Sequence, residues 1–320
     1  MKAKICIPKK DRSTPIFLLL LLLILCACKQ HNITKTQPTT ELAAPKLKTL
    51  NVNDYNFHYI DIGEGEPVVL VHGTVGDYRT WEAQMDAFSK NHRVIAYSRR
   101  YAHPNNQMVN DSTDYSVRTH AKDLSEFLKA LNLGPVHLIG HSYGALTSLV
   151  ATLEHPELMR SLTLGEGPIM SLLPNVPNGE KMLNDFVTEA FVPTAEAFAE
   201  NDEQKAVEIF IGGVLADPAY FSKASQLHRD IMIANTVELK GIVSRDNLFP
   251  VLSCEEIQQL KVPTLLVKGD RSPEILIALT NEVDKCIEDN GKVTLTDTSH
   301  GLMYENPKDF NKLVLDFIKK

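Results

Sequence analysis

The sequence predicts an α/β fold: a mostly parallel sheet flanked by helices, with a helical cap inserted late in the chain. From residue 48 onward, short apolar runs alternate with segments of helical periodicity. The apolar runs are almost continuous, as expected of parallel strands that are covered on both faces. The stretch 169–250 breaks the alternation, because it contains helical patterns and no convincing strand. Strands that alternate with helices indicate one sheet with right-handed crossovers.

Six apolar runs are the strand candidates, and three amphipathic segments are the clearest helices. The strands are VVLVHG (68–73), RVIAYS (93–98), PVHLIG (135–140), SLTLGE (161–166), PTLLVKG (263–269) and KVTLTD (292–297). The helices are TWEAQMDAF (80–88), VRTHAKDLSEFLKAL (117–131) and FNKLVLDFIKK (310–320).

The insertion at about 169–250 lies between two strand candidates and holds helices such as EKMLNDFVTEAF and QKAVEIFIGGVL. It could be a structural subdomain without contact to a ligand. We favour a cap over the sheet edge, because sheets of this kind bind ligands at the carboxyl ends of their strands.

Composition excludes several classes of function. The 320 residues are 43% hydrophobic and 23% charged, which is typical of a globular protein with a sizeable core. The net charge is −7, and no Lys/Arg cluster occurs beyond the N-terminus, so we expect no nucleic-acid partner. The chain contains no HExxH, paired CxxC, phosphate-binding GxxxxGK[ST] or GxGxxG motif. We therefore expect neither a metal nor a cofactor.

The first 27 residues are typical of an export signal. Lysines and an arginine precede IFLLLLLLILCA, an apolar run of 12 residues, which is shorter than the ~20 that a membrane span requires. Leu25, Ala27 and Cys28 resemble the lipobox of bacterial lipoproteins, in which the cysteine is acylated and becomes the mature N-terminus. This resemblance implies an exported lipoprotein, attached to a membrane on the periplasmic or outer surface. An uncleaved anchor and ordinary secretion are the alternatives.

Residues 28–47 are Thr-rich and punctuated by prolines, which favours a flexible spacer ahead of a domain at 48–320. Within that domain Cys254 and Cys286 are the cysteines. They could pair in an oxidising compartment, but the sequence does not decide whether their Cα atoms come close enough.

The pentapeptide Gly140–Gly144, GHSYG, places Ser142 between a strand and a helix. Glycines allow a sharp turn there, and the turn lifts the serine hydroxyl clear of the sheet at the positive end of a helix. A serine needs a base to become a nucleophile. His300 is the best candidate, because it follows the last strand and a parallel sheet delivers its loop to the same edge.

These motifs, with HGTVGDYRTW (72–81), PTLLVKGD (263–270) and SHGLMYENP (299–307), resemble those of the α/β-hydrolase fold family. The resemblance covers about residues 48–320. It implies Ser142 as nucleophile, His300 as general base and then general acid, and an oxyanion hole formed by the backbone N–H groups of Thr74 and Tyr143.

The acidic member of the triad departs from the family's usual pattern. The position three residues after Gly269 is Ser272, which cannot act as a carboxylate. Asp270 and Glu166 are the nearby alternatives, and we favour Glu166, because some relatives take the acid from the end of the strand after the nucleophile. Asp77 and Arg100 are expected to brace the loops around the site.

The resulting hypothesis is a serine hydrolase that acts on a small acyl substrate, a carboxylic ester first. An amide or peptide, and a C–C bond beside a carbonyl, are the alternatives on the same triad. Epoxide hydrolases and haloalkane dehalogenases on this fold generally use an aspartate where this chain has Ser142. A binding protein on a hydrolase scaffold is the alternative from another class of function.

Overall fold

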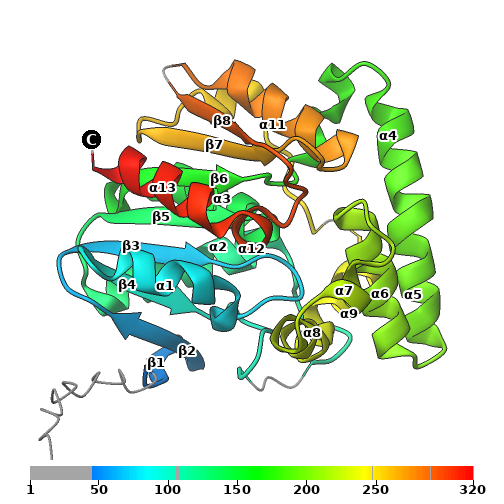
Figure 1. Ribbon diagram of the computed structural model, residues 1–320, viewed down its shortest axis with the longest axis horizontal. Coiled ribbons are helices and arrows are strands. Elements are labelled where there is room, and N and C mark those ends of the chain that lie inside the picture. The colour runs from blue at the N-terminus through cyan, green and yellow to red at the C-terminus, as the bar shows by residue number, and fades with distance from the viewer. Residues whose placement is uncertain (1–44, 106–108, 247, 289, 320) are drawn as a thin grey trace, which may run out of the picture. The chain divides into compact units, whose positions relative to one another are not determined.

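The computed structural model describes residues 45–105, 109–246, 248–288 and 290–319. An eight-stranded sheet runs through it in the order β1-β2-β4-β3-β5-β6-β7-β8 (Figure 1). The strands are β1 (Lys48–Val52), β2 (Tyr55–Ile62), β3 (Glu66–Val71), β4 (His92–Tyr97), β5 (Val136–His141), β6 (Met159–Gly165), β7 (Thr264–Gly269) and β8 (Gly291–Leu295). From β4 to β8 along the sheet every pairing is parallel. The predicted α/β fold and its six strands are confirmed.

The strands β1 and β2 form an antiparallel hairpin at the edge of the sheet, and the sequence patterns did not single them out. Asn53 and Asp54 form its turn with φ of 51° and 62°. A two-residue turn of this kind needs positive φ at both positions, which Asn and Asp tolerate well. The alternation of aromatic residues at Tyr55, Phe57 and Tyr59 was the signal available in the sequence. In the structure these rings face the core and contact Phe127 or one another.

Helices cover both faces of the sheet. One face carries α1 (Glu82–Phe88), α12 (Leu302–Glu305) and α13 (Pro307–Ile318), and the other carries α2 (Val117–Leu131), α3 (Tyr143–Glu154) and α11 (Glu274–Cys286). Each face has its own cluster of buried apolar side chains. This double cover is the reason that the parallel strands are apolar on both sides. Two short 3-10 segments, Tyr78–Trp81 and Pro156–Leu158, complete the layers.

The helix α2 has the bounds that the sequence predicts. The Ser116 side chain accepts a hydrogen bond from Thr119 N at 3.3 Å and caps its start. Asn132, with φ of 50°, ends it in the left-handed conformation.

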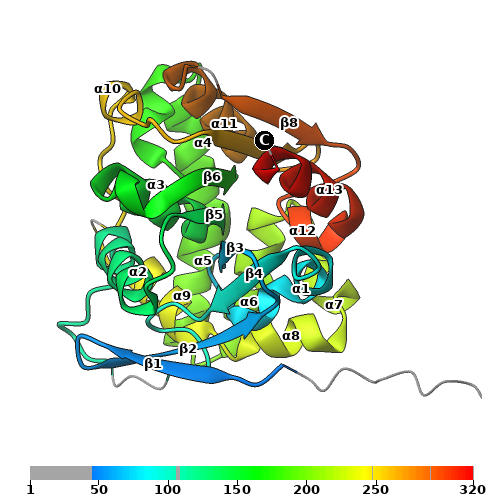
Figure 2. The same cartoon turned by 90° about the vertical axis from the view of Figure 1, so that its left-hand side faces the viewer.

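The insertion between β6 and β7 is helical and lies beside the carboxyl ends of the parallel strands (Figures 1 and 2). We call it the cap. Its helices are the 3-10 segment Met170–Asn175, α4 (Gly179–Phe186), a π-helical turn at Val187–Phe191, α5 (Val192–Ala199), α6 (Glu203–Val214), α7 (Tyr220–Lys223), α8 (Gln226–Ile233) and α9 (Thr236–Ser244). A third apolar cluster, which includes Phe198, Phe210 and Leu239, forms the interior of the cap.

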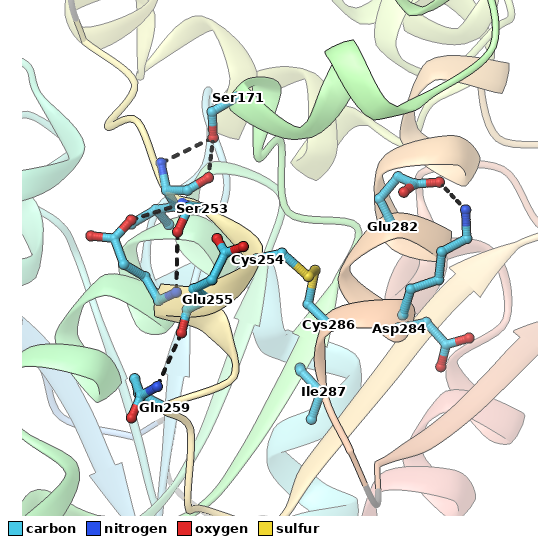
Figure 3. The surroundings of a disulfide bond; sticks show 12 residues. Ser171, Ser253, Cys254, Glu255, Gln259, Glu282, Asp284, Cys286 and Ile287 are labelled. Carbon is cyan, nitrogen blue, oxygen red and sulfur yellow. Dashed lines mark hydrogen bonds and ion pairs between the residues drawn. A yellow bond between two sulfur atoms is a disulfide. The ribbon is translucent and has the colours of Figure 1, made fainter.

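A disulfide joins Cys254 to Cys286 (Figure 3). Their Cα atoms are 5.1 Å apart, within the range that a disulfide spans without backbone movement. The bond ties α10 (Cys254–Ile257), which follows the cap, to the last residue of α11. The pairing that the sequence left open is therefore present in the structure.

Among the described residues, no helix has the length and hydrophobicity needed to cross a bilayer. The expected export signal, Cys28 and most of the expected spacer belong to residues 1–44, outside the described part of the chain.

Candidate active site

Ser142 occupies a strained turn between β5 and α3. Its φ is 54° and its ψ is −125°, a backbone conformation that a non-glycine residue rarely adopts. Ser142 N donates to Gly165 O at 2.8 Å, which fixes the turn against β6. Gly144 allows this arrangement, because a Cβ at that position would lie 2.3 Å from His72 O and 2.4 Å from Val71 O. The first turn of α3 can thus lie directly against the end of β3.

His300 lies in the loop between β8 and α12 and contacts a buried carboxylate. Its Nδ1 is 2.6 Å from Glu166 Oε2, and the two residues are 3% and 1% exposed. Glu166 Oε1 accepts a hydrogen bond from Gly269 N at 2.9 Å. A proton on Nδ1 satisfies the carboxylate and leaves Nε2 free as an acceptor. That tautomer is the one a general base requires.

Asp270, the alternative acid, makes no contact with His300. It is exposed, and its Oδ1 accepts a hydrogen bond from Thr298 N at 3.1 Å. Ser272, at the family's usual acid position, is buried, with 7% of its surface exposed. Its hydroxyl has no hydrogen-bond partner among the described residues. Of the two carboxylates that the sequence offered, the structure brings only Glu166 to the histidine.

Two further residues hold the His300 loop, and sequence analysis did not identify either. His141 Nε2 lies 2.7 Å from His300 O, and the two rings are 4.6 Å apart. Burial and the neighbouring His300 hold the pKa of His141 well below its usual value, so His141 is neutral and donates through Nε2. Glu305 accepts hydrogen bonds from Ser299 N and Ser299 Oγ at 2.8 and 2.5 Å.

Thr74 and Tyr143 are the two candidate donors near the serine. Tyr143 is the first residue of α3, so its N–H has no partner within the helix. Gly73 lies against Ser142, since a Cβ placed on this glycine would be 3.0 Å from Ser142 Cβ. Both Thr74 and Ser142 line the same cavity. A second, smaller cavity is lined by Thr74, Ser142 and Tyr143 together, so both candidate donors border one space beside the serine.

His72 stabilises the loop that carries Thr74. Its Nδ1 donates to Gly73 O at 2.8 Å, and its Nε2 accepts from Arg99 N at 2.9 Å. Burial, together with the positive charge of Arg99, lowers the pKa of His72 to about 3. The ring is therefore neutral at physiological pH, with its proton on Nδ1.

The cavity has a volume of about 70 Å³ and lies between the sheet edge and the cap. Ser142 and His300 form its floor, and cap side chains form an apolar wall: Phe210, Ile211, Val214, Leu215, Ile231 and Met232. A second cavity of about 30 Å³ also reaches Thr74, Ser142 and His300 and is lined by Phe186, Phe191 and Phe249. Neither wall contains a Lys or Arg among the described residues.

His228 of α8 lines the larger cavity, and the sequence motifs did not single it out. It is half-buried, and its ring makes an edge contact with Tyr304 at 4.5 Å. Burial lowers the pKa of His228, so it provides a neutral hydrogen-bonding group rather than a cation.

Asp77 and Arg100 bind neighbouring elements. Asp77 accepts hydrogen bonds from Arg79 N at 2.9 Å and from Asn235 Nδ2 at 2.8 Å, which links the loop after β3 to the cap. Arg100 forms a two-point ion pair with Asp123 of α2. It is the preceding residue, Arg99, that reaches the loop beside Ser142.

Comparisons with known proteins identify the family and the fold of the chain. Residues 66–307 match the family model described as the alpha/beta hydrolase fold. The chain is 24% identical to 2-hydroxy-6-oxo-6-(2'-aminophenyl)hexa-2,4-dienoic acid hydrolase of Metapseudomonas resinovorans, over 85% of this chain and 90% of that one. Two solved structures share the fold. Carboxylesterase CesB of Bacillus subtilis has a TM-score of 0.67 and 18% identity, over 86% of this chain and 92% of that one. A Bacillus megaterium epoxide hydrolase has a TM-score of 0.68 and 19% identity, over 85% of this chain and 100% of that one.

Because His72 is neutral in the folded protein, we expect the free energy of unfolding to decrease as the pH falls. The folded protein takes up this proton only near pH 3, whereas the unfolded chain takes it up near pH 6.5. Between these values the unfolded state binds more protons, so the free energy of unfolding should decrease as pH falls, by at most ~1.4 kcal/mol per pH unit for this group. Urea unfolding between pH 7.5 and 4.5 should show a shallower decrease in His72→Gln than in the wild type. His155→Gln, at a partly exposed position, is the control and should keep the wild-type slope. Equal slopes in His72→Gln and the wild type would contradict the assignment.

Proposed function

We propose that this chain, which belongs to the α/β-hydrolase fold family and is a hydrolase, cleaves a neutral carboxylic ester through an acyl-enzyme on Ser142. The observation that carries the proposal is the 2.6 Å contact between His300 Nδ1 and Glu166 Oε2, with His300 and Ser142 on the floor of one cavity. A strained serine, an oriented imidazole and a buried carboxylate are the components that acyl transfer requires.

In the proposed reaction, His300 Nε2 removes the Ser142 hydroxyl proton as Oγ attacks the ester carbonyl carbon. The oxygen of the tetrahedral intermediate carries a negative charge, and the N–H groups of Thr74 and Tyr143 stabilise it. When the intermediate collapses, His300 gives its proton to the departing alkoxide. A water molecule then attacks the acyl-enzyme with His300 again as base, and His300 returns this proton to Ser142 Oγ as the acid leaves. Glu166 orients the imidazole and stabilises its positive form throughout.

The walls of the two cavities favour an ester over a C–C substrate. The Metapseudomonas relative is named for a dienoic acid, whose carboxylate would need a cation on binding. No Lys or Arg occurs among the described residues of either wall, and Arg99 nearby is already paired with Glu238. The small apolar space supports a neutral substrate with a short acyl chain. A C–C hydrolase on the same residues is the second candidate, because that relative aligns over most of both chains.

A fluorophosphonate probe tests the nucleophile. The probe forms a covalent bond with an activated serine, so we expect labelling of the wild type and none of Ser142→Ala. p-Nitrophenyl acetate and butyrate should be hydrolysed faster than the decanoate, and all of them faster than a 2-hydroxy-6-oxo-dienoic acid. Folded wild type that stays unlabelled would refute the role of Ser142. Preferred turnover of the dienoic acid would select the second candidate.

The two carboxylates differ in their expected effects on turnover. Glu166→Gln keeps the size of the side chain but removes the charge that stabilises the His300 imidazolium, so kcat should fall by on the order of 10^4. Asp270→Asn is the matched control, because its carboxylate accepts from Thr298 N and does not reach His300; kcat should change by less than about tenfold. Ester hydrolysis by the purified variants checks both values. A collapse in Asp270→Asn with activity retained in Glu166→Gln would reverse the assignment.

We also propose that the enzyme acts from a membrane surface, to which an acylated Cys28 attaches it. The apolar run before Leu25-Cys26-Ala27-Cys28 supports this location. Labelling with a radioactive fatty acid should mark the wild type in the membrane fraction, and Cys28→Ser should lose the label and become soluble. Cys26→Ser is the matched control and should keep both properties. Membrane attachment that persists in Cys28→Ser would indicate an uncleaved anchor.

A further inference from the structure

Arg99 is a fully buried arginine that binds the backbone of the loop beside Ser142. It follows β4, and its side chain is 0% exposed. Its Nε donates to His72 O and its Nη2 donates to Gly73 O, both at 3.0 Å. One guanidinium therefore holds two successive carbonyls of the loop that leads to Thr74.

A carboxylate from the cap holds this guanidinium. Arg99 Nη1 and Nη2 donate to Glu238 Oε1 and Oε2 at 2.5 and 2.6 Å, and Glu238 belongs to α9. Glu238 is 2% exposed, and His120 Nε2 lies 3.1 Å from its Oε1. Burial disfavours the charged carboxylate, but Arg99 and His120 outweigh it and keep the pKa of Glu238 well below its usual range. A buried pair that loses one partner leaves an uncompensated charge, so the two side chains need each other.

The orientation of the Gly73–Thr74 peptide follows from these contacts. The bond is trans, since the cis bond among the described residues is His103–Pro104. In a trans peptide the C=O and the N–H point in opposite directions. Gly73 O points to Arg99 Nη2 and to His72 Nδ1, so Thr74 N–H points away from them. Thr74 borders the cavity that Ser142 also lines, and no described residue accepts a hydrogen bond from Thr74 N.

Arg99 also contacts the residue that supplies the other candidate donor. Its guanidinium lies over the Tyr143 ring, 5.1 Å from the centroid. The Tyr143 hydroxyl donates to Tyr115 O at 2.6 Å, which anchors the far end of that side chain. The same buried cation is therefore in contact with both halves of the proposed oxyanion hole.

We infer that Arg99 and Glu238 are positioning residues for the oxyanion hole. Through these two residues, the position of the cap on the sheet determines the direction of the Thr74 N–H. This inference rests on the proposed function. Glu238 fixes the guanidinium, the guanidinium fixes Gly73 O, and the peptide plane then directs Thr74 N–H toward the charge that develops next to Ser142. Donors contribute to catalysis in this way only when they are held in place before the charge forms. An enzyme whose α9 is displaced would keep its triad and lose part of its transition-state stabilisation.

Glu238→Gln tests the inference, because the amide has nearly the same shape but offers one acceptor oxygen in place of two and carries no charge. Arg99→Lys is the second variant, since a lysine keeps the charge but cannot span two carbonyls and a carboxylate at once. Asp123→Asn is the matched control: Asp123 forms a similar two-point pair with Arg100, which does not reach the His72–Thr74 loop. Activities are normalised to active sites titrated with the fluorophosphonate.

Complete loss of one oxyanion donor costs about 10²–10³ in kcat, so a misdirected donor in Glu238→Gln should cost about 10- to 100-fold, with KM changed less than about threefold. Affinity for a trifluoromethyl ketone, which forms a tetrahedral adduct on the serine, should fall by a similar factor, while that for the product alcohol stays constant. Asp123→Asn should keep wild-type kcat and ketone affinity even if its melting temperature falls.

The outcomes separate this inference from the proposed function. An active wild type with Glu238→Gln and Arg99→Lys equal to the control in kcat and ketone affinity would overturn the positioning role and leave the serine hydrolase intact. A wild type that neither labels nor hydrolyses esters would overturn both. If Arg99→Lys does not fold, Glu238→Gln alone decides, because its substitution is nearly isosteric.

Discussion

The site depends on one packing constraint, the close approach of α3 to the end of β3 at Gly144. Any side chain at this position would collide with the carbonyl oxygens of Val71 and His72. Because the contact is backbone to backbone, it brings the first N–H of α3 next to the loop that carries Thr74. The strained φ of Ser142 is a consequence, since the chain must reverse within one residue to enter the helix. The approach of Gly144 to the end of β3 therefore places the serine and both candidate donors next to one another.

Two buried carboxylates divide the electrostatic work around this turn. Glu166 faces His300, a group that gains and loses a proton in the proposed reaction, whereas Glu238 faces Arg99, whose charge is permanent. Without Glu238, the uncompensated guanidinium would oppose a positive charge on neighbouring imidazoles, as it already does for His72. Pairing it with a cap residue lets a cation support the backbone of the site while its charge is compensated.

Much of the architecture could be predicted from local sequence, because parallel strands and amphipathic helices carry their own periodicity. Ser142 and His300 were also accessible, since a strand-turn-helix motif and the last strand of a parallel sheet place them at one edge. The preference for Glu166 over Asp270 rested on the resemblance alone, because both residues follow strands and only the course of the two loops decides which carboxylate reaches the ring.

Some features could not be predicted from the sequence because they depend on contacts between distant segments. Arg99 and Glu238 are 139 positions apart, and neither lies in a motif that would mark it as part of a site. Cys254 and Cys286 are 32 positions apart, and their distance depends on how α10 packs on α11. A single sequence contains no record of such pairings. His228 was missed for the same reason, because only the folded cap turns it toward the cavity.

The cap attaches to the sheet through residues that differ from those facing the cavity. Glu238 of α9 and its neighbour Asn235 bind Arg99 and Asp77, and the disulfide fixes the segment that follows. The cap wall of the larger of the two cavities comes mainly from α6 and α8. Changes in α6 or α8 can therefore alter the shape of the substrate space while the contacts that direct Thr74 stay in place. Substitution of Glu238 has the opposite character, since this residue acts on the loop that carries Thr74 and lines neither cavity. On the proposed function, substrate selection and transition-state stabilisation are separable because different cap residues carry them, even where both lie on α9, as Ile242 and Glu238 do.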